Sequence, residues 1–178
     1  MYGWNGKSLW VDLASHRLET RETDPATLRS FIGGRGLNDL ALFGLVRPGI
    51  DPLGPANALA FAVGPLTGTA LSSTSRVEVS TLSPLSGILG DGSAGGAFGL
   101  SMKRTGFDQF VFTGVSKVPV VLLVDGQEAR LAEAQDLLGT TTWEKTDLLR
   151  QRHGANFSVA AIGQAGENLV RFASVIFD

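Results

Sequence analysis

Three glycine-rich loops, each next to basic side chains, are the strongest chemical feature of this sequence. The first is Gly33-Gly-Arg-Gly36. The second comprises Gly64–Thr69 and Ser72–Ser75, which precede Arg76, and the third, Ser93-Ala-Gly-Gly96, precedes Lys103-Arg104. Backbone N–H groups of such loops can approach an anion, and an arginine can bind phosphate through its fork of donors. Any one loop is most often only a turn. Three in a short chain predict a flat, backbone-lined surface for a large anionic cofactor.

Other kinds of catalytic chemistry have little support in the sequence. The chain has 178 residues with two histidines and no cysteine, which excludes a disulfide, a zinc–thiolate site and an iron–sulfur site within it. His16 is expected in a turn and His153 at a helix C-terminus, so both are interpreted as structural. A nucleophile elbow, a P-loop and a carboxylate cluster with metal-ligand spacing are also missing. No catalytic residue is predicted.

The composition is that of a folded domain with an excess of glycine. Of 178 residues 43% are hydrophobic, the mean hydropathy is +0.15, and the formal net charge is −2. This charge gives no electrostatic reason to expect nucleic acid or an anionic membrane as partner. The N-terminus does not resemble a signal peptide, and the apolar runs are too short to span a bilayer. A cytoplasmic protein is predicted. The 23 glycines are about twice the average usage.

Strands and helices are needed to position the glycine loops. Hydrophobic alternation predicts strands at 8–13, 17–21, 57–63, 76–81, 107–114, 118–124, 129–131, 158–162 and 171–177. Helices are expected at 24–33, about 38–45, 100–105 and 141–154, the last opened by the capping box Thr141–Glu144. Leu28, Phe31 and Ile32 should share one buried helix face, which Gly33 should end as a left-handed cap. The stretch 83–99 is expected to be a long loop.

The order of these elements repeats along the chain. Strand, turn, strand and capped helix at 8–34 recur at 118–154, and the strand pair at 57–81 recurs at 158–177. An α+β fold is predicted, with duplicated, pseudo-two-fold related β-sheets and flanking helices in one domain, 1–178. Coincidence among generic hairpin and helix pieces is the alternative.

The second repeat is expected to be incomplete. The first covers about 1–116, and the second, about 117–178, stops where the counterpart of the third glycine loop should begin. Strand edges left without neighbours pair readily with another chain. A homo-oligomer is therefore predicted.

Several motifs together resemble the N-terminal domain of the aldehyde ferredoxin oxidoreductase family, over the whole chain. They include Phe31-Ile-Gly-Gly-Arg-Gly-Leu37, Gly64-Pro-Leu-Thr-Gly-Thr69, Gly95-Gly-Ala-Phe-Gly99 and Ala161-Ile-Gly-Gln-Ala-Gly-Glu-Asn-Leu-Val-Arg-Phe-Ala173. The resemblance implies a base of two pseudo-symmetric sheets carrying a bis-pterin cofactor with tungsten or, in some members, molybdenum.

The resemblance also implies roles for individual residues. Arg76 corresponds to an arginine that binds a pterin phosphate. Ser93 corresponds to a residue whose main chain contacts the Mg²⁺ that joins the two pterin phosphates; the family usually has asparagine there, and a main-chain carbonyl contact would tolerate serine. Ala94, Gly95 and Gly96 complete the cofactor-binding segment, the two glycines lying beside the pterin.

Family members are several times longer than this chain. Their later domains supply the cysteines of a [4Fe–4S] cluster and the groups around the metal. The resemblance thus implies an N-terminal piece of an enzyme that oxidises an aldehyde to a carboxylate and passes electrons to a ferredoxin-like acceptor. The chain alone is expected to be inactive. The alternative is a stand-alone, non-catalytic module that binds a pterin or another phosphorylated ligand, or that assists assembly.

Overall fold

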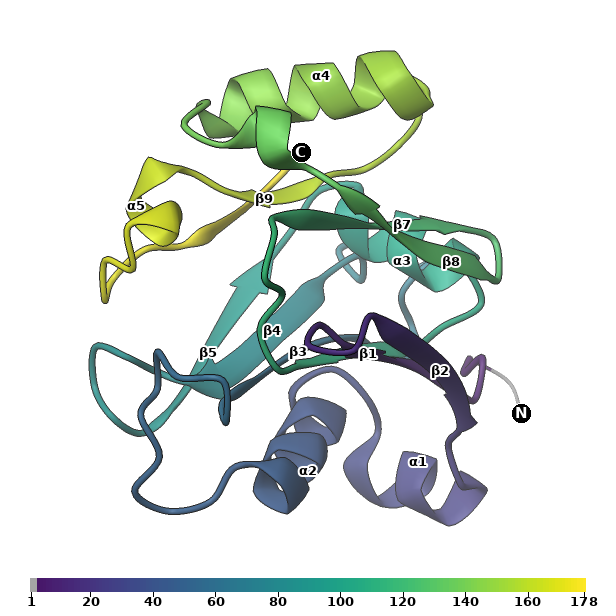
Figure 1. The fold of residues 1–178 in the computed structure, drawn as a ribbon. Coiled ribbons are helices and arrows are strands. Elements are labelled where there is room, and N and C mark those ends of the chain that lie inside the picture. The colour runs from purple at the N-terminus through teal and green to yellow at the C-terminus, as the bar shows by residue number, and fades with distance from the viewer. Residues whose placement is uncertain (1–2) are drawn as a thin grey trace.

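A computed structural model describes residues 3–178 and contains one mixed, six-stranded sheet. Its strands are β1 (Lys7–Asp12), β2 (Arg17–Glu22), β3 (Ala58–Val63), β4 (Val77–Leu82), β5 (Leu89–Ala94) and β6 (Gln109–Thr113). They lie in the order β2-β1-β6-β3-β4-β5, with β1 and β6 parallel and the other neighbours antiparallel. The glycine-rich strand β5 therefore forms one edge of the sheet (Figure 1).

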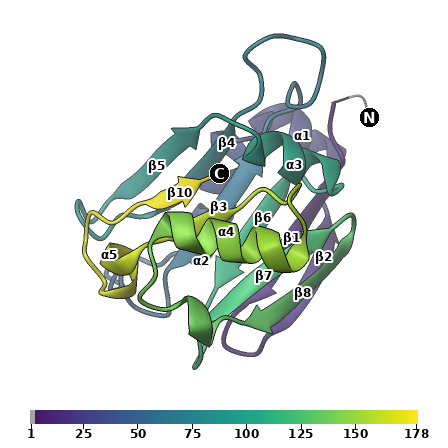
Figure 2. The same cartoon turned by 90° about the horizontal axis from the view of Figure 1, so that it is seen from above.

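Two small sheets and five helices complete the fold. The small sheets pair β7 (Val120–Asp125) with β8 (Glu128–Glu133), and β9 (Ala160–Ile162) with β10 (Val175–Phe177). The helices are α1 (Pro25–Phe31), α2 (Arg35–Leu45), α3 (Phe98–Arg104), α4 (Thr142–His153) and α5 (Gln164–Glu167), with a short 3₁₀ turn at Gln135–Leu137. α1 and α2 lie on one face of the large sheet, and the two small sheets with α4 lie over the other (Figures 1 and 2).

The alternation of side chains along β3 explains how both faces of the six-stranded sheet are covered. Phe61 and Val63 belong to the cluster into which Leu122 of β7 packs, on the side of the small sheets. Ala60 and Ala62, both fully buried, contact the helix side instead. Successive strand residues point to opposite faces, and the small alanines let the helices pack closely on the sheet.

Several sequence signals that depend on neighbouring residues are confirmed. Asp24 caps α1 by accepting the Thr27 N–H at 3.1 Å, and Thr141 and Glu144 form the reciprocal capping box of α4. The turn at Gly126, whose φ is +56°, connects β7 and β8 as the sequence predicted. These caps satisfy N–H groups that a helix start leaves without intrahelical partners.

The end of α1 differs from the prediction. Leu28 is buried as expected, but Phe31 and Ile32 are 40% and 60% exposed, so the three do not share a buried face. The C-cap residue is Ile32, with φ +65° and ψ −55°, and Gly33 follows with φ +153°, so the helix does not end at Gly33 as the cap. Gly33 serves close packing instead, because a Cβ there would lie 2.9 Å from the Val63 carbonyl oxygen. The chain turns sharply into α2, which begins at Arg35 rather than near Asn38.

The prediction of a long loop over 83–99 is wrong, because this stretch contains β5. β5 is antiparallel to β4, with Val77 opposite Ala94 and Leu82 opposite Leu89. Its sequence, Leu-Gly-Asp-Gly-Ser-Ala, has no apolar alternation, since most of its side chains face solvent at the sheet edge. Backbone pairing with β4 therefore defines this strand. The turn expected at Gly163–Gly166 likewise includes the short helix α5.

The α+β class is confirmed, whereas the pseudo-two-fold duplication stays a prediction. The four strands of the first repeat for which the sequence predicted counterparts join one sheet, but those counterparts form two separate two-stranded sheets. In residues 3–178, every helix is too short or too polar to cross a membrane.

Candidate functional site

The predicted cofactor residues meet where β4 begins and β5 ends. Antiparallel pairing sets Glu78 opposite Ser93 and Val77 opposite Ala94, so the start of one strand lies beside the end of the other. Arg76 directly precedes β4, and its Nη1 donates to the Ser93 hydroxyl over 3.2 Å. The register thus brings the arginine and the serine into contact although 17 positions separate them in the sequence.

Gly95 and Gly96, which follow β5, have no side chains, so the backbone there is uncovered. A Cβ built on Gly95 or on Gly96 would have no other atom within 4 Å, so open space lies over both residues. Gly96 has φ +88°, a conformation that L side chains rarely adopt. Ala94 packs its methyl group against the core, leaving its backbone as the part a ligand could reach. These features fit a flat group lying against the main chain.

A cavity of about 510 Å³ lies beside this glycine pair. Arg76, Gly95 and Gly96 line it, together with the loop from Gly68 to Ser75 and part of α3. Gly99 lets α3 approach so closely, because a Cβ there would lie 2.9 Å from the carbonyl carbon of Arg76. Close packing of helix and strand start therefore positions this wall of the cavity.

The cavity walls are basic and polar. The residues lining it include two arginines, Arg76 and Arg104, and no aspartate or glutamate. Neither arginine forms an ion pair with any residue from 3 to 178. Ser75 also lines the cavity, and its hydroxyl oxygen is buried without a hydrogen-bond partner in the described structure. A buried hydroxyl without a partner is costly, so this arrangement is suited to an anionic ligand.

The first glycine loop is in a different environment. Arg35, which opens α2, pairs with Asp91 of β5 at 2.5 Å and lies 3.9 Å from Glu78 of β4. Its charge is therefore neutralised within the fold, and it does not line the cavity. Nearby, burial raises the pKa of Asp39, and the negative charge of Asp91 adds to this effect while Arg35 opposes it. The three loops therefore do not form one continuous basic surface.

The two histidines are away from this cavity. His16 is exposed in the turn after β1, where its Nε2 lies 2.9 Å from the Ser116 hydroxyl. His153 ends α4 and packs near the ring of Phe157. In residues 3–178 no three His, Cys, Asp or Glu side chains are grouped so that they could hold a metal ion.

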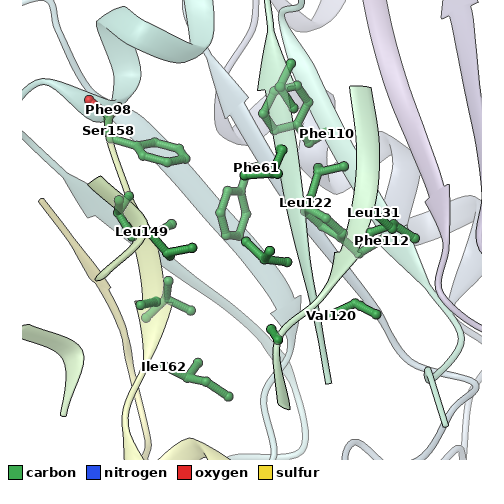
Figure 3. Close-up of a pocket in the computed structure, with 18 of the residues that line it drawn as sticks. Phe61, Phe98, Phe110, Phe112, Val120, Leu122, Leu131, Leu149, Ser158 and Ile162 are labelled. Atoms are coloured by element: carbon green, nitrogen blue, oxygen red, sulfur yellow. The ribbon is translucent and has the colours of Figure 1, made fainter. Parts of the chain in front are cut away.

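A second, larger cavity of about 920 Å³ lies between the six-stranded sheet and the layer above it. Its walls are largely aromatic and aliphatic, and Figure 3 shows Phe61 between Phe98 and Leu149 on one side and Leu122 and Phe112 on the other. Arg104 also reaches its rim, whereas Arg76 and the glycine pair do not. Apolar side chains of this kind contribute to packing and carry no acid, base or nucleophile.

Comparison with known proteins identifies relatives that match nearly the whole chain. The family profile described as aldehyde ferredoxin oxidoreductase, N-terminal domain, matches residues 8–178. The tungsten-containing aldehyde ferredoxin oxidoreductases of Pyrococcus furiosus and Thermococcus kodakarensis are each 35% identical to the chain over its whole length. The chain belongs to the aldehyde ferredoxin oxidoreductase family. It spans about 30% of the length of these two relatives.

The family also includes proteins with other names. An aliphatic sulfonate oxidoreductase, WOR-like subunit, of Pyrococcus furiosus is 31% identical over 99% of the chain. A solved structure of the active site complex BamBC of benzoyl coenzyme A reductase superimposes with a TM-score of 0.95 and 33% identity, over 99% of this chain and 27% of that one. The fold is therefore shared among members of the family that carry different names.

The residues to which the resemblance assigned cofactor contacts lie close together in the fold. Arg76 contacts Ser93, and Arg76, Gly95 and Gly96 line one cavity, while their roles toward a cofactor stay predictions. The sequence indicated Arg104 only as a basic side chain near the third glycine loop, and not as a second arginine lining the same cavity as Arg76. An exposed arginine late in a helix gives no periodic signal, and only the packing of α3 places it there.

Proposed function

We propose that this chain is the N-terminal tungstopterin-binding domain of an aldehyde ferredoxin oxidoreductase-like enzyme. The observation that carries the proposal is the meeting of Arg76, Ser93 and the bare glycine pair at one end of β4 and β5. Family membership supports it, because the two relatives that are 35% identical to the chain are named as tungsten-containing enzymes.

Each residue would act on the cofactor by binding or orienting it. Arg76 would hold a pterin phosphate through its guanidinium, which the Ser93 hydroxyl already orients at 3.2 Å. The main-chain carbonyl of Ser93 would contact the Mg²⁺ that joins the phosphates. Ala94, Gly95 and Gly96 would present backbone to the pterin, since open space lies over both glycines. The protein thereby contributes binding and orientation, while the cofactor carries the redox chemistry.

The complete enzyme would oxidise an aldehyde to a carboxylate with oxygen from water. The tungsten, or molybdenum, supplies this two-electron chemistry when it is bound. Other domains would provide the [4Fe–4S] cluster, and a ferredoxin-like protein would accept the electrons. We also expect a homo-oligomer, because β5 is an exposed edge strand able to pair with another chain.

The experiment that tests the proposal is Arg76→Ala in the protein that carries this chain, followed by tungsten and pterin analysis. We expect a clear fall in both contents relative to wild type. Arg130→Ala is the matched control, since Arg130 is an exposed arginine on β8 without an ion pair in the described structure. Tungsten content equal to wild type in Arg76→Ala would overturn the role of Arg76.

The same analysis separates the proposal from the alternative of a stand-alone binding module. A non-catalytic module would retain pterin or phosphate after purification but contain neither tungsten nor molybdenum. The bound metal therefore discriminates between the two functions.

A further inference from the structure

The cavity beside Gly95 and Gly96 is lined by two arginines, and only one of them is among the proposed cofactor contacts. Arg76 forms one part of its wall, and Arg104 of α3 contributes a second guanidinium. Lys103, the neighbour of Arg104, is already paired with the fully buried carboxylate of Asp108. Arg104 is exposed and has no carboxylate partner among residues 3–178. The cavity thus contains two cationic groups whose charges the described fold does not neutralise.

The loop facing α3 adds a polar wall with one free donor. Thr69 and Thr74 donate their hydroxyl hydrogens to the carbonyls of Leu66 and Leu71, at 2.8 and 3.0 Å, and so shape the loop. The Ser75 hydroxyl, by contrast, is buried with no hydrogen-bond partner in the described structure. A hydroxyl has one hydrogen to donate, so Ser75 can still give its own to a ligand.

Charge and volume together restrict the ligand. Two guanidinium groups and a hydroxyl donor, with no carboxylate in the lining, match an oxyanion with several acceptor oxygens. A volume of about 510 Å³ is larger than a phosphoryl group needs, and it continues over Gly95 and Gly96. The anion can therefore be free or be one end of a larger molecule lying on the glycines.

We propose that this cavity is a phosphoryl-binding site in which Arg104 and Ser75 act together with Arg76. The inference rests on the proposed function in that Arg76 is shared with the cofactor surface, whereas Arg104 and Ser75 are not part of it. Arg104 binds the anion from α3, opposite the loop that carries Ser75. The phosphoryl group belongs either to the bound cofactor or to a separate anion, and the test separates these sources.

The test is titration of the cofactor-free protein with inorganic phosphate, at ionic strength held constant with potassium chloride, followed by amide NMR. Saturable shifts are expected at Ser75, Arg76 and the glycine pair. Arg104→Gln should weaken phosphate binding at least about tenfold, as loss of a charged hydrogen bond does. Arg130→Gln removes the same charge elsewhere and should leave the dissociation constant within about twofold. Unchanged spectra outside the cavity show that each variant is folded.

Repeating the titration with cofactor-loaded protein identifies the source of the phosphoryl group. Phosphate that no longer binds shows that the cofactor's own phosphoryl group fills the cavity, whereas phosphate that still binds shows a separate anion site. Both outcomes support the inference.

Two results would overturn it: no saturable shift at the cavity, or equal weakening in Arg104→Gln and Arg130→Gln. If Arg76→Gln weakens phosphate binding and Arg104→Gln does not, the inference fails and the proposed function stands. If Arg104→Gln weakens phosphate binding while Arg76→Ala leaves tungsten and pterin contents unchanged, the role of Arg76 fails and the Arg104 site stands.

Discussion

Lys103 and Arg104 are neighbours on α3, yet they have opposite surroundings. The Lys103 side chain is 11% exposed and pairs with Asp108, whose carboxylate is fully buried and also accepts the Gly6 N–H at 2.7 Å. Arg104 is exposed beside the cavity and has no ion pair within residues 3–178. Lys103 thus forms an ion pair within the fold, whereas Arg104 is available to a ligand.

The same contrast recurs between Arg35 and Arg76 at the strand pair β4–β5. Arg35 is neutralised by Asp91 and lies near Glu78, so it connects α2 to both strands. Arg76 contacts only the neutral hydroxyl of Ser93 among the polar side chains described. Ion pairs that stabilise a fold and arginines that bind a ligand should therefore respond differently to substitution.

The largest effect is expected where an ion pair is most buried. Lys103→Met would leave the Asp108 carboxylate buried without its cation, at a cost of about 3–5 kcal/mol in the free energy of unfolding. Arg104→Met is the control on the same helix and should cost about 0.5 kcal/mol or less. Urea unfolding at neutral pH measures both. Equal costs would break the comparison, because they would mean that Arg104 also holds the fold together.

A second largely buried ion pair, Lys145–Glu167, should have a smaller effect on the free energy of unfolding, and this effect should depend on pH. Lys145 donates to Glu167, whose carboxylate also accepts the Gly139 N–H at 2.9 Å. Together these contacts lower the pKa of Glu167 below its ordinary value near 4.5, and the hydrogen bond from Lys145 has the largest effect. Glu167→Gln keeps the shape, removes the charge and should cost about 2 kcal/mol at pH 7.

The sign of the pH dependence follows from the lowered pKa. The unfolded chain binds a proton at Glu167 more readily than the folded one, so the contribution of the carboxylate is complete above about pH 4.5. It is lost as the pH falls through the lower folded pKa. Urea unfolding of wild type and Glu167→Gln should therefore converge in acid. A difference that stays constant down to pH 2 would contradict the ion pair.

Features set by adjacent residues were predictable from the sequence, and features set by distant contacts were less so. The caps at Asp24 and Thr141 and the turn at Gly126 depend on neighbouring residues and were confirmed. β5 was missed because its pairing with β4 is made by backbone groups, which its mostly exposed side chains do not reveal. The exposure of Ile32 was missed because the chain leaves the helix there to enter α2.

The same division holds within the candidate site. Glycine pairs and an arginine before a strand are visible in the sequence, so Arg76 and Gly95–Gly96 could be proposed from it. That Ser93 contacts Arg76 depends on the β4–β5 register, which no local pattern contains. Whether a cation is neutralised depends on carboxylates distant in sequence, as Asp91 is from Arg35. The distinction between arginines paired with a carboxylate and arginines without such a partner in the described structure therefore needed the fold.

Substitution of the exposed, paired arginine should have a modest effect. Arg35→Gln removes the ion pair with Asp91, but the Arg35 side chain is 57% exposed and solvent screens it. We expect a loss of about 0.5–1 kcal/mol in the free energy of unfolding, decreasing in high salt. Arg76→Gln should change it by less, since Arg76 has no carboxylate partner in the described structure. If Arg76→Gln costs more, Arg76 is a structural residue and the comparison fails.

The smallest expected effect has the opposite sign and tests the charge balance around Arg35. Burial and the nearby Asp91 raise the pKa of Asp39, and one of its carboxylate oxygens is buried without a hydrogen bond in the described structure. Ionisation of Asp39 therefore opposes folding, and Asp39→Asn should raise the free energy of unfolding by about 0.5 kcal/mol at pH 7.

Because the folded state holds the Asp39 proton more tightly than the unfolded chain does, this gain should be full above the raised pKa. It should disappear below the ordinary value of 3.8. Asp147→Asn, on the exposed side of α4, is the matched control. A loss of stability in Asp39→Asn at pH 7 would mean that attraction to Arg35 outweighs burial. Arg35 would then stabilise the carboxylates of both Asp39 and Asp91, in addition to lying near Glu78. Arg35 would differ even more from Arg76, which has no carboxylate partner in the described structure.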